Sequence, residues 1–204
     1  MKLCFFGGTF DPPHRGHLTI ARAAADRFAL DRVLLVPANV PPHKRATPVT
    51  DYEHRLAMVK AAVAPQHHSR LVASDIESPA HTAGAPNYSV ETLRQLRATL
   101  SPGDELYLLL GADAFQSFAK WHQPEEIARL AQFIVCNRPG YNIDAASAAL
   151  PPALRAAIQM NRVDDVLEDV SATEIRAAVA AGRPLEDLVP PAVAQYIREH
   201  RLYS

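Results

Sequence analysis

The chain has 204 residues, a length that favours one large domain over two small ones. Its 21 Lys and Arg residues nearly balance its 22 Asp and Glu residues, and the net charge of −1 argues against a broadly basic surface that coats nucleic acid or an anionic membrane. A composition of 48% hydrophobic and 21% charged residues is typical of a globular protein and excludes general disorder.

Apolar strand-like segments alternate with helical patterns along the chain. The expected strands are 2–6, 32–36, 71–76, 105–110, 132–136 and 163–170. The expected helices cover about 17–28, 50–64, 89–100, 125–131, 171–181 and 190–200. Two capping boxes, Thr50 with Glu53 and Ser171 with Glu174, mark helix starts, and Gly182 marks a helix end. Residues 141–162 are rich in Ala and Pro and carry no assignment.

This alternation predicts an α/β fold, a doubly wound and mostly parallel sheet with helices on both faces. We expect a single domain over residues 1–204, with its C-terminal helical part, about 171–204, packed on the same domain. Such sheets bind ligands at the carboxyl ends of their strands, near a topological switch point. The segments expected at that edge are 7–9, 37–44, 111–113, Arg138 and Ser171.

Cys4 and Cys136 both lie in strand-like segments. A disulfide or a reactive thiol is the alternative to two small buried hydrophobic residues, and we favour the second interpretation. Met1 and Lys2 lead into a short strand rather than a signal peptide, and no apolar run reaches the roughly 18–20 residues of a membrane span. A soluble cytoplasmic protein is expected.

The segment from Gly7 to His17 carries the strongest chemical pattern. Glycines follow the first strand and precede a helix, a place where backbone N–H groups and the helix dipole suit a phosphate. The segment matches neither the P-loop nor the Gly-x-Gly-x-x-Gly pattern, so a phosphate site depends on His14 and His17. A metal site is a weaker alternative because no third ligand has zinc-like spacing. The plainest alternative is one capping and one surface histidine.

The string Gly-Gly-Thr-Phe-Asp-Pro-Pro-His-Arg-Gly-His at 7–17 resembles the signature of the nucleotidylyltransferase superfamily, which has a Rossmann-like fold and a His-x-Gly-His motif. The resemblance implies that His14 and His17 stabilise the transition state of attack on a nucleotide α-phosphate. It also implies that the strand end and turn form part of the ATP site: Gly7, Gly8, Thr9 and Phe10.

Ser171-Ala172-Thr173-Glu174-Ile175-Arg176 resembles the second signature of the same superfamily, with Ala172 in place of the commoner Ser. Taken alone, the segment is a capped helix with a surface arginine. The resemblance implies that Ser171 and Thr173 bind ATP and that Arg176 neutralises polyphosphate charge. Lys44 of Pro41-Pro42-His43-Lys44 is expected to share that task, although a solvated basic loop also explains this string.

The segments 41–44, 87–89, 111–113 and 121–122 resemble the corresponding segments of one family, the nicotinate-nucleotide adenylyltransferases. Each match has a plainer structural alternative: Ser89 and Asp113 as helix caps, Trp121 as a core residue. The resemblance implies ribose binding by Gly111 and Asp113, with Arg138 as a further ATP contact. It places the mononucleotide at His43, Tyr88, Ser89, Trp121 and His122.

These observations predict adenylyl transfer from ATP to nicotinate mononucleotide, with Mg²⁺ carried by ATP and no protein-built metal site. Nicotinamide mononucleotide and pantetheine phosphate stay open as acceptors, and a nucleotide-binding sensor without catalysis is the alternative outside enzymes. We expect no nucleic-acid or membrane partner, and a homo-oligomer is left open.

Overall fold

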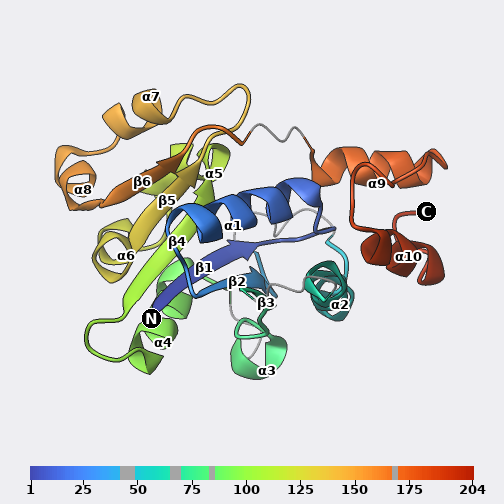
Figure 1. Cartoon of the computed structure of the whole chain (residues 1–204), viewed down its shortest axis with the longest axis horizontal. Helices are drawn as coiled ribbons and strands as arrows, with labels where there is room; N and C mark the ends of the chain where they lie inside the picture. The colour runs from blue at the N-terminus through green and yellow to red at the C-terminus, as the bar shows by residue number, and fades with distance from the viewer. Residues whose placement is uncertain (42–48, 65–69, 83–85, 167–169) are drawn as a thin grey trace.

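The computed structural model describes the chain except for residues 42–48, 65–69, 83–85 and 167–169 (Figure 1). The described strands form one six-stranded sheet in the order β3-β2-β1-β4-β5-β6, and every pairing is parallel. Their bounds are β1 Lys2–Gly8, β2 Arg32–Pro37, β3 Leu71–Ala73, β4 Glu105–Gly111, β5 Gln132–Cys136 and β6 Met160–Val163. The predicted doubly wound parallel sheet is therefore confirmed.

Helices connect these strands and cover both faces of the sheet (Figure 1). Those of the first half are α1 Arg15–Arg27, α2 Tyr52–Val63, α3 Pro79–Thr82, α4 Ser89–Thr99 and α5 Ala112–Gln116. Those of the second half are η2 Phe118–Lys120, α6 Pro124–Leu130, α7 Ile143–Ala148, α8 Pro152–Ala157, α9 Ala172–Ala180 and α10 Pro191–Glu199.

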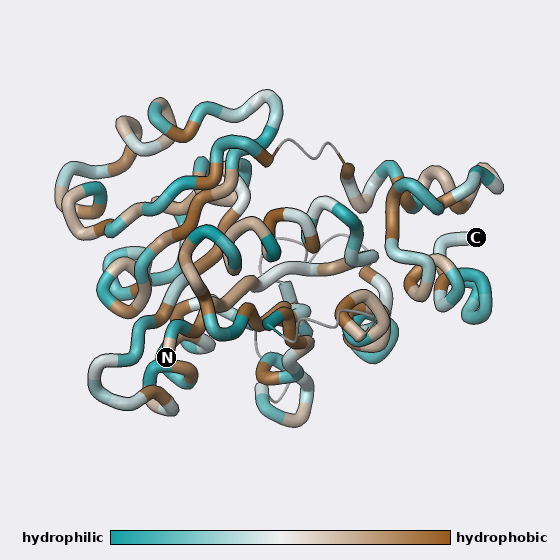
Figure 2. The backbone as a smooth tube through the Cα atoms, viewed as in Figure 1, coloured by the Kyte–Doolittle hydropathy of each residue, from teal (hydrophilic) through white to brown (hydrophobic). Residues whose placement is uncertain are grey.

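Alternation along β1 divides the core into two clusters, because successive strand side chains point to opposite faces. Cys4 and Phe6 pack with residues of α1, α2, α9 and α10, whereas Leu3 and Phe5 pack with residues of α4 to α8. Hydrophobic residues accordingly concentrate along the strands, and the helices mix both kinds (Figure 2). The C-terminal helices thus complete the same hydrophobic cluster as the first strand and helix.

The predicted last strand at 163–170 is wrong, since β6 covers Met160–Val163 and pairs with β5 from Phe133 to Cys136. Its sequence, Met-Asn-Arg-Val, lacks an apolar pattern because it is an edge strand. There Asn161 donates to the Phe133 carbonyl at 3.2 Å, and Arg162 pairs with Asp144 at 2.5 Å. The unassigned residues 141–162 form α7, α8 and this strand.

The predicted helix starts differ from the observed ones in informative ways. α1 begins at Arg15 rather than His17, with His14 at the N-cap. α2 has Asp51 at its N-cap, so the predicted Thr50 capping box is wrong. α4 has Tyr88 rather than Ser89 at its N-cap. The box at Ser171 and Glu174 is confirmed, with the Glu174 N–H donating to Ser171 Oγ at 3.2 Å.

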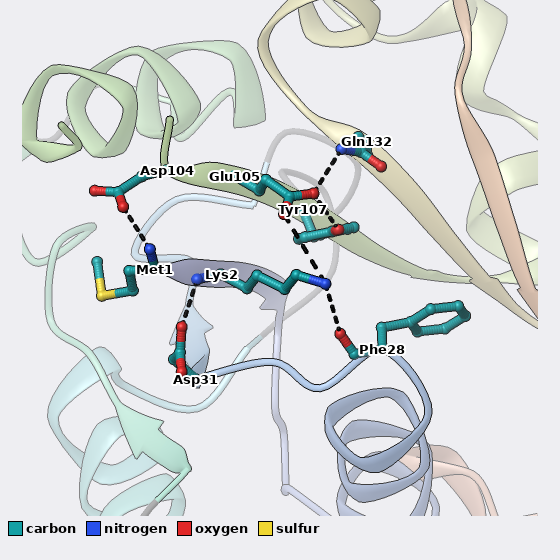
Figure 3. Close-up of polar contacts among 8 residues, drawn as sticks. All are labelled: Met1, Lys2, Phe28, Asp31, Asp104, Glu105, Tyr107 and Gln132. Atoms are coloured by element: carbon teal, nitrogen blue, oxygen red, sulfur yellow. Dashed lines mark hydrogen bonds and ion pairs between the residues drawn. The ribbon is translucent and has the colours of Figure 1, made fainter. Parts of the chain in front are cut away.

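Hydrogen bonds and ion pairs link the N-terminal ends of the strands, opposite the carboxyl ends that carry the motifs (Figure 3). The Met1 ammonium lies 2.5 Å from Asp104, and the Lys2 backbone N–H donates to Asp31 at 2.6 Å. Glu105 accepts from Tyr107 at 2.6 Å and from Gln132 at 3.1 Å. These contacts join β1, β4 and β5 at the edge where no ligand is expected.

Cys4 and Cys136 are free and buried, as predicted. Burial raises the pKa of the Cys136 thiol to about 12 and that of Cys4 further, so neither is a thiolate near neutral pH. Within the described ranges, no helix has the length and apolar character to cross a bilayer.

Candidate active site

A cavity of about 340 Å³ opens at the carboxyl edge of the sheet. Its walls come from the ends of β1, β4 and β5, from the segment after β2, and from the start of α1. In the strand order, β1 lies between β2 and β4, so the chain reverses its direction of winding at this point. The cavity therefore occupies the topological switch point where such folds bind ligands.

The structure brings most of the predicted site residues to this one cavity. Those that line it are Gly7, Gly8, Thr9, His14, His17, Tyr88, Ser89, Gly111, Asp113, Trp121, His122 and Arg138. Phe10 lies behind the wall: it is 2% exposed and packs edge-on against Phe6, and its ring centre lies 4.8 Å from that of His17. Any contact of Phe10 with ATP would be through its backbone.

The turn after β1 depends on a side chain being absent at Gly8. A Cβ on Gly8 would lie 3.1 Å from the ring of Phe10, which itself adopts φ 49°, a backbone conformation that is rare outside glycine. This strained turn folds the Phe10 ring under His17. The glycine therefore makes room for a supporting aromatic ring as well as for an approaching ligand.

The two histidines of the motif form a stacked pair. Their ring centres lie 3.6 Å apart with 29° between the planes, and the His14 backbone N–H donates to His17 Nδ1 at 3.2 Å. Because Nδ1 of His17 accepts this hydrogen bond, the proton of the neutral ring resides on Nε2. One backbone bond thus fixes both the tautomer and the orientation of His17.

His14 is buried, with 7% exposed, and occupies the N-cap of α1. Burial, with a further contribution from the Arg138 cation, lowers the pKa of His14 to about 4. In the ligand-free site His14 is therefore neutral near pH 7. An anion placed here would favour the charged form and raise that pKa again.

Asp113 and Arg138 meet at the ends of β4 and β5. Arg138 Nη1 lies 3.1 Å from Asp113 Oδ2, and a Cβ on Gly111 would lie only 2.5 Å from Asp113 Oδ1. Gly111 thus lets the carboxylate fold back over the strand end. The pair presents a carboxylate, able to accept hydroxyl protons, beside a cation within electrostatic reach of His14.

Aromatic side chains form another part of the cavity wall. The Tyr88 and His122 ring centres are 4.4 Å apart, and Trp121 packs edge-on against Phe118 at 5.5 Å. Trp121 follows η2 and is half-buried, so it combines a core contact with a surface on the cavity. Ser89 is the first residue of α4, where unpaired helix N–H groups suit a carboxylate.

The second signature lies beside the cavity rather than in its wall. Over the described residues, the lining includes Val166 and Val170 but not Ser171, Thr173 or Arg176. Arg176 donates to the Asp11 carbonyl at 2.8 Å and to Thr173 Oγ1 at 3.3 Å. In the ligand-free chain it therefore joins α9 to the turn of the first motif. His43 and Lys44 lie outside the described residues.

Sequence reasoning missed Arg55, which is 1% exposed. Its guanidinium donates to four main-chain carbonyls: Thr50 at 2.7 Å, Thr9 at 2.9 Å, Ala38 at 2.7 Å and Asn39 at 3.3 Å. It thereby joins the turn after β1 to the segment after β2. The signal that could have found it is an arginine between Tyr52 and Leu56, residues of the buried face of α2.

Sequence reasoning also missed Glu77, which is 4% exposed and lines the cavity near Asn87 and Tyr88. Thr92 Oγ1 donates to its carboxylate at 2.5 Å. Burial raises the pKa of Glu77 to about 7, and the Thr92 bond acts in the opposite direction. No local pattern predicted this carboxyl, because Asp75 and Ser78 beside it are polar in sequence.

The described residues contain no group of three or more His, Cys, Asp or Glu side chains placed to hold a metal ion. The first motif contributes two imidazoles to the cavity, and the Asp113 carboxylate that also lines it is already paired with the Arg138 guanidinium. Such a set suits an anionic ligand and does not fit a divalent ion held by the protein.

The cytidylyltransferase-like family profile matches residues 5–178, which include both signatures and the cavity. A probable nicotinate-nucleotide adenylyltransferase of Solibacter usitatus is 42% identical over 204 residues and covers 100% of both chains. One from Chromobacterium violaceum is 40% identical, over 97% of this chain and 96% of its own. The chain thus belongs to the cytidylyltransferase-like family and, within it, to the nicotinate-nucleotide adenylyltransferases.

Solved structures agree with the fold. A nicotinic acid mononucleotide adenylyltransferase of Plasmodium falciparum, complexed with NaAD, superposes with a TM-score of 0.77 at 17% identity, over 99% of this chain and 97% of that one. A putative nicotinate-nucleotide adenylyltransferase of Vibrio parahaemolyticus superposes with a TM-score of 0.69 at 22% identity, over 99% and 94%.

Proposed function

We propose that the chain transfers the adenylyl group of ATP to nicotinate mononucleotide. The mononucleotide phosphate attacks the α-phosphate, a new P–O bond forms, the bond to the β-phosphate breaks, and nicotinate adenine dinucleotide and pyrophosphate leave. The observation that carries this proposal is the single cavity shared by the stacked histidines, the Asp113 carboxylate and the Tyr88–Trp121 aromatic wall. Full-length relatives of the same family support it.

The reaction needs little proton transfer. A phosphate monoester has a second pKa of roughly 6, so the nucleophile is already ionised near neutral pH. The obstacles are repulsion between two anions and the charge that develops on the leaving pyrophosphate. Positioning and preorganised positive charge address both.

We assign His14 and His17 to the ATP phosphates and to the transition state. The backbone bond to His17 Nδ1 leaves its Nε2–H as a donor of defined orientation. The depressed pKa of His14 keeps its ring neutral near pH 7 in the ligand-free site, and bound phosphate charge would raise that pKa. Arg138 supplies a permanent positive charge at the same end of the cavity, beside His14.

The adenosine half of ATP would lie along the carboxyl ends of β1 and β4. Gly7, Gly8, Thr9 and Gly111 present backbone there, and the Asp113 carboxylate would accept the ribose hydroxyls. Arg176, Ser171 and Thr173 would contact the outer phosphates from α9, and Lys44 from the loop after β2.

The mononucleotide would occupy the aromatic end. Trp121 would stack on the pyridine ring, and the backbone at Ser89 and His122 would bind the ring carboxylate at the start of α4 and after η2. Tyr88 packs on the His122 ring and holds that side of the wall. We keep His43 as a further contact.

Mg²⁺ would enter with ATP, held by phosphate oxygens and water rather than by protein side chains.

The test is pyrophosphate release from the purified chain with ATP and one acceptor at a time. Nicotinate mononucleotide should give a kcat/KM well above that for nicotinamide mononucleotide, and pantetheine phosphate should give none. A higher value for either alternative would reassign the acceptor. ATP binding without turnover on any acceptor would favour the sensor interpretation.

A further inference from the structure

Asp11 is a buried carboxylate inside the first signature, three residues before His14. It is 4% exposed and does not belong to the described lining of the cavity. A buried carboxylate is costly unless it is hydrogen-bonded. The Tyr203 hydroxyl donates to its Oδ1 at 2.7 Å, and the Thr50 backbone N–H donates to its Oδ2 at 3.3 Å.

Tyr203 lies at the far end of the chain, 192 residues from Asp11. Its hydroxyl is the phenolic partner that the carboxylate needs, and burial together with this bond raises the pKa of Tyr203. The hydroxyl therefore stays protonated and donating across the range in which the enzyme would work. The nearby Arg55 guanidinium also interacts favourably with the Asp11 charge.

The C-terminal part of the chain makes further hydrogen bonds to the turn that contains Asp11. Arg176 Nη1 donates to the Asp11 carbonyl at 2.8 Å. The Arg15 backbone N–H donates to the Leu188 carbonyl at 3.0 Å, and Arg15 Nη2 donates to the Glu186 carbonyl at 2.7 Å. Residues 11–15 are thus bracketed by α9, by the segment before α10 and by the chain end.

We propose that Tyr203 is a positioning residue for the two histidines, acting through Asp11. This rests on the proposed function of the His14–His17 pair. The turn that Asp11 anchors leads directly into His14, whose backbone N–H orients His17 and whose ring stacks on it at 3.6 Å. A shift of the turn by a fraction of that distance would break the bond that fixes the His17 tautomer.

The test compares Tyr203→Phe with a matched control, Tyr196→Phe. Tyr196 lies on α10, and its hydroxyl bonds to His54 Nδ1 of α2 at 3.0 Å, whereas no hydrogen bond among the described residues joins that hydroxyl to the first signature. Each variant removes one hydroxyl oxygen from the same C-terminal region, and only Tyr203→Phe removes a hydrogen bond to Asp11. If Tyr203 only stabilised the fold, the two variants would have similar kcat values.

For Tyr203→Phe we expect kcat to fall by about 10-fold to 100-fold, because displaced histidines slow the chemical step. The KM values for both substrates should stay within about twofold of the parent. Tyr196→Phe should keep kcat within about twofold, whatever its melting temperature. A loss of kcat that is equal in both variants, or a Tyr203→Phe enzyme with parental kcat, would overturn the proposal.

Nitrogen NMR of the imidazoles provides a readout independent of turnover. Tyr203→Phe should shift the His17 Nδ1 resonance toward that of a nitrogen without the backbone bond, and Tyr196→Phe should not. If the parent releases no pyrophosphate, the proposed function fails while this spectrum still tests the positioning role. Unchanged His17 resonances in Tyr203→Phe would refute that role.

Asp11→Asn is the second variant, for the case in which Tyr203→Phe does not fold. It keeps an acceptor oxygen for Tyr203 but removes the charge, so it should lower kcat in the same direction and shift the same resonance. If both single variants fold, the loss of kcat in their double variant should be smaller than the product of the two single losses, since Tyr203 acts through the Asp11 side chain. Independent multiplication of the two losses would contradict the proposal.

Discussion

Arg55 offers the sharpest test of how the phosphate end of the cavity is built. Arg55→Lys keeps the positive charge and shortens the reach, so it isolates the geometry of the guanidinium. The native side chain donates to four carbonyls at 2.7, 2.9, 2.7 and 3.3 Å, through all three nitrogens of its planar guanidinium. An ammonium has three donors on one atom and cannot reproduce that arrangement.

The magnitude follows from the bonds that are lost. Hydrogen bonds that involve a charged group contribute roughly 1.5–3 kcal/mol each, and the lysine loses at least two of the four, so we expect the free energy of unfolding to fall by about 3–6 kcal/mol. That is a large part of the roughly 5–15 kcal/mol typical of a domain. Turnover should fall as well, because the Thr9 carbonyl in the turn after β1 is one of the acceptors.

Urea unfolding followed by the fluorescence of Trp121, the single tryptophan, measures the loss. The matched control is Arg94→Lys, because Arg94 is also bonded at several points, to Glu91, Gln123 and Glu126, but on the surface. Exposed pairs of this kind contribute little. If Arg55→Lys is no less stable than Arg94→Lys, the four carbonyl bonds do not hold these segments together and the reasoning is refuted.

Three further outcomes are expected. His17→Ala should lower kcat by roughly 10²–10³, as the loss of one transition-state donor does, and near-normal turnover would exclude that role. Asp113→Ala should raise KM for ATP by about 10-fold to 100-fold. The parent but not the variant should discriminate against 2′-deoxy-ATP. Equal discrimination by the two enzymes would refute a contact between Asp113 and the ribose. Glu77 has its pKa raised from 4.5 to about 7, so the stability that its protonated form contributes is present at low pH and is lost as the pH rises through 7. Glu77→Gln, which stays neutral, should gain about 2 kcal/mol in unfolding free energy relative to the parent between pH 5 and pH 8, measured by urea titration, and a pH-independent difference would contradict the raised pKa.

Local patterns were sufficient wherever one segment decides its own structure. The alternation of apolar runs with amphipathic stretches predicted the parallel sheet, and Ser171 and Gly182 marked the two ends of a helix that the structure confirms. Strand polarity then placed the loops after β1, β4 and β5 at one edge, so the common cavity of His14 and Asp113 followed from topology.

Local patterns failed where a partner distant in sequence determines the outcome. The β6 strand has no apolar signature because it is an edge strand whose polar residues bond to β5 and α7. Thr50 does not cap α2, which has Asp51 at its N-cap; instead the Thr50 backbone bonds to distant residues, its N–H to Asp11 and its carbonyl to Arg55.

What the amino-acid sequence determined by itself is the fold class, the order of its elements and the residue types at the strand ends, since periodicity and motif spacing are properties of neighbouring residues. Only the tertiary structure decided that Arg176 bonds to the Asp11 carbonyl, that Tyr203 supplies the hydroxyl for the Asp11 carboxylate, and that four carbonyls converge on Arg55. The physical reason is that a buried charge is satisfied by whichever groups the folded chain brings within hydrogen-bonding distance. Those groups come from segments up to 192 residues apart, a separation that no local pattern records.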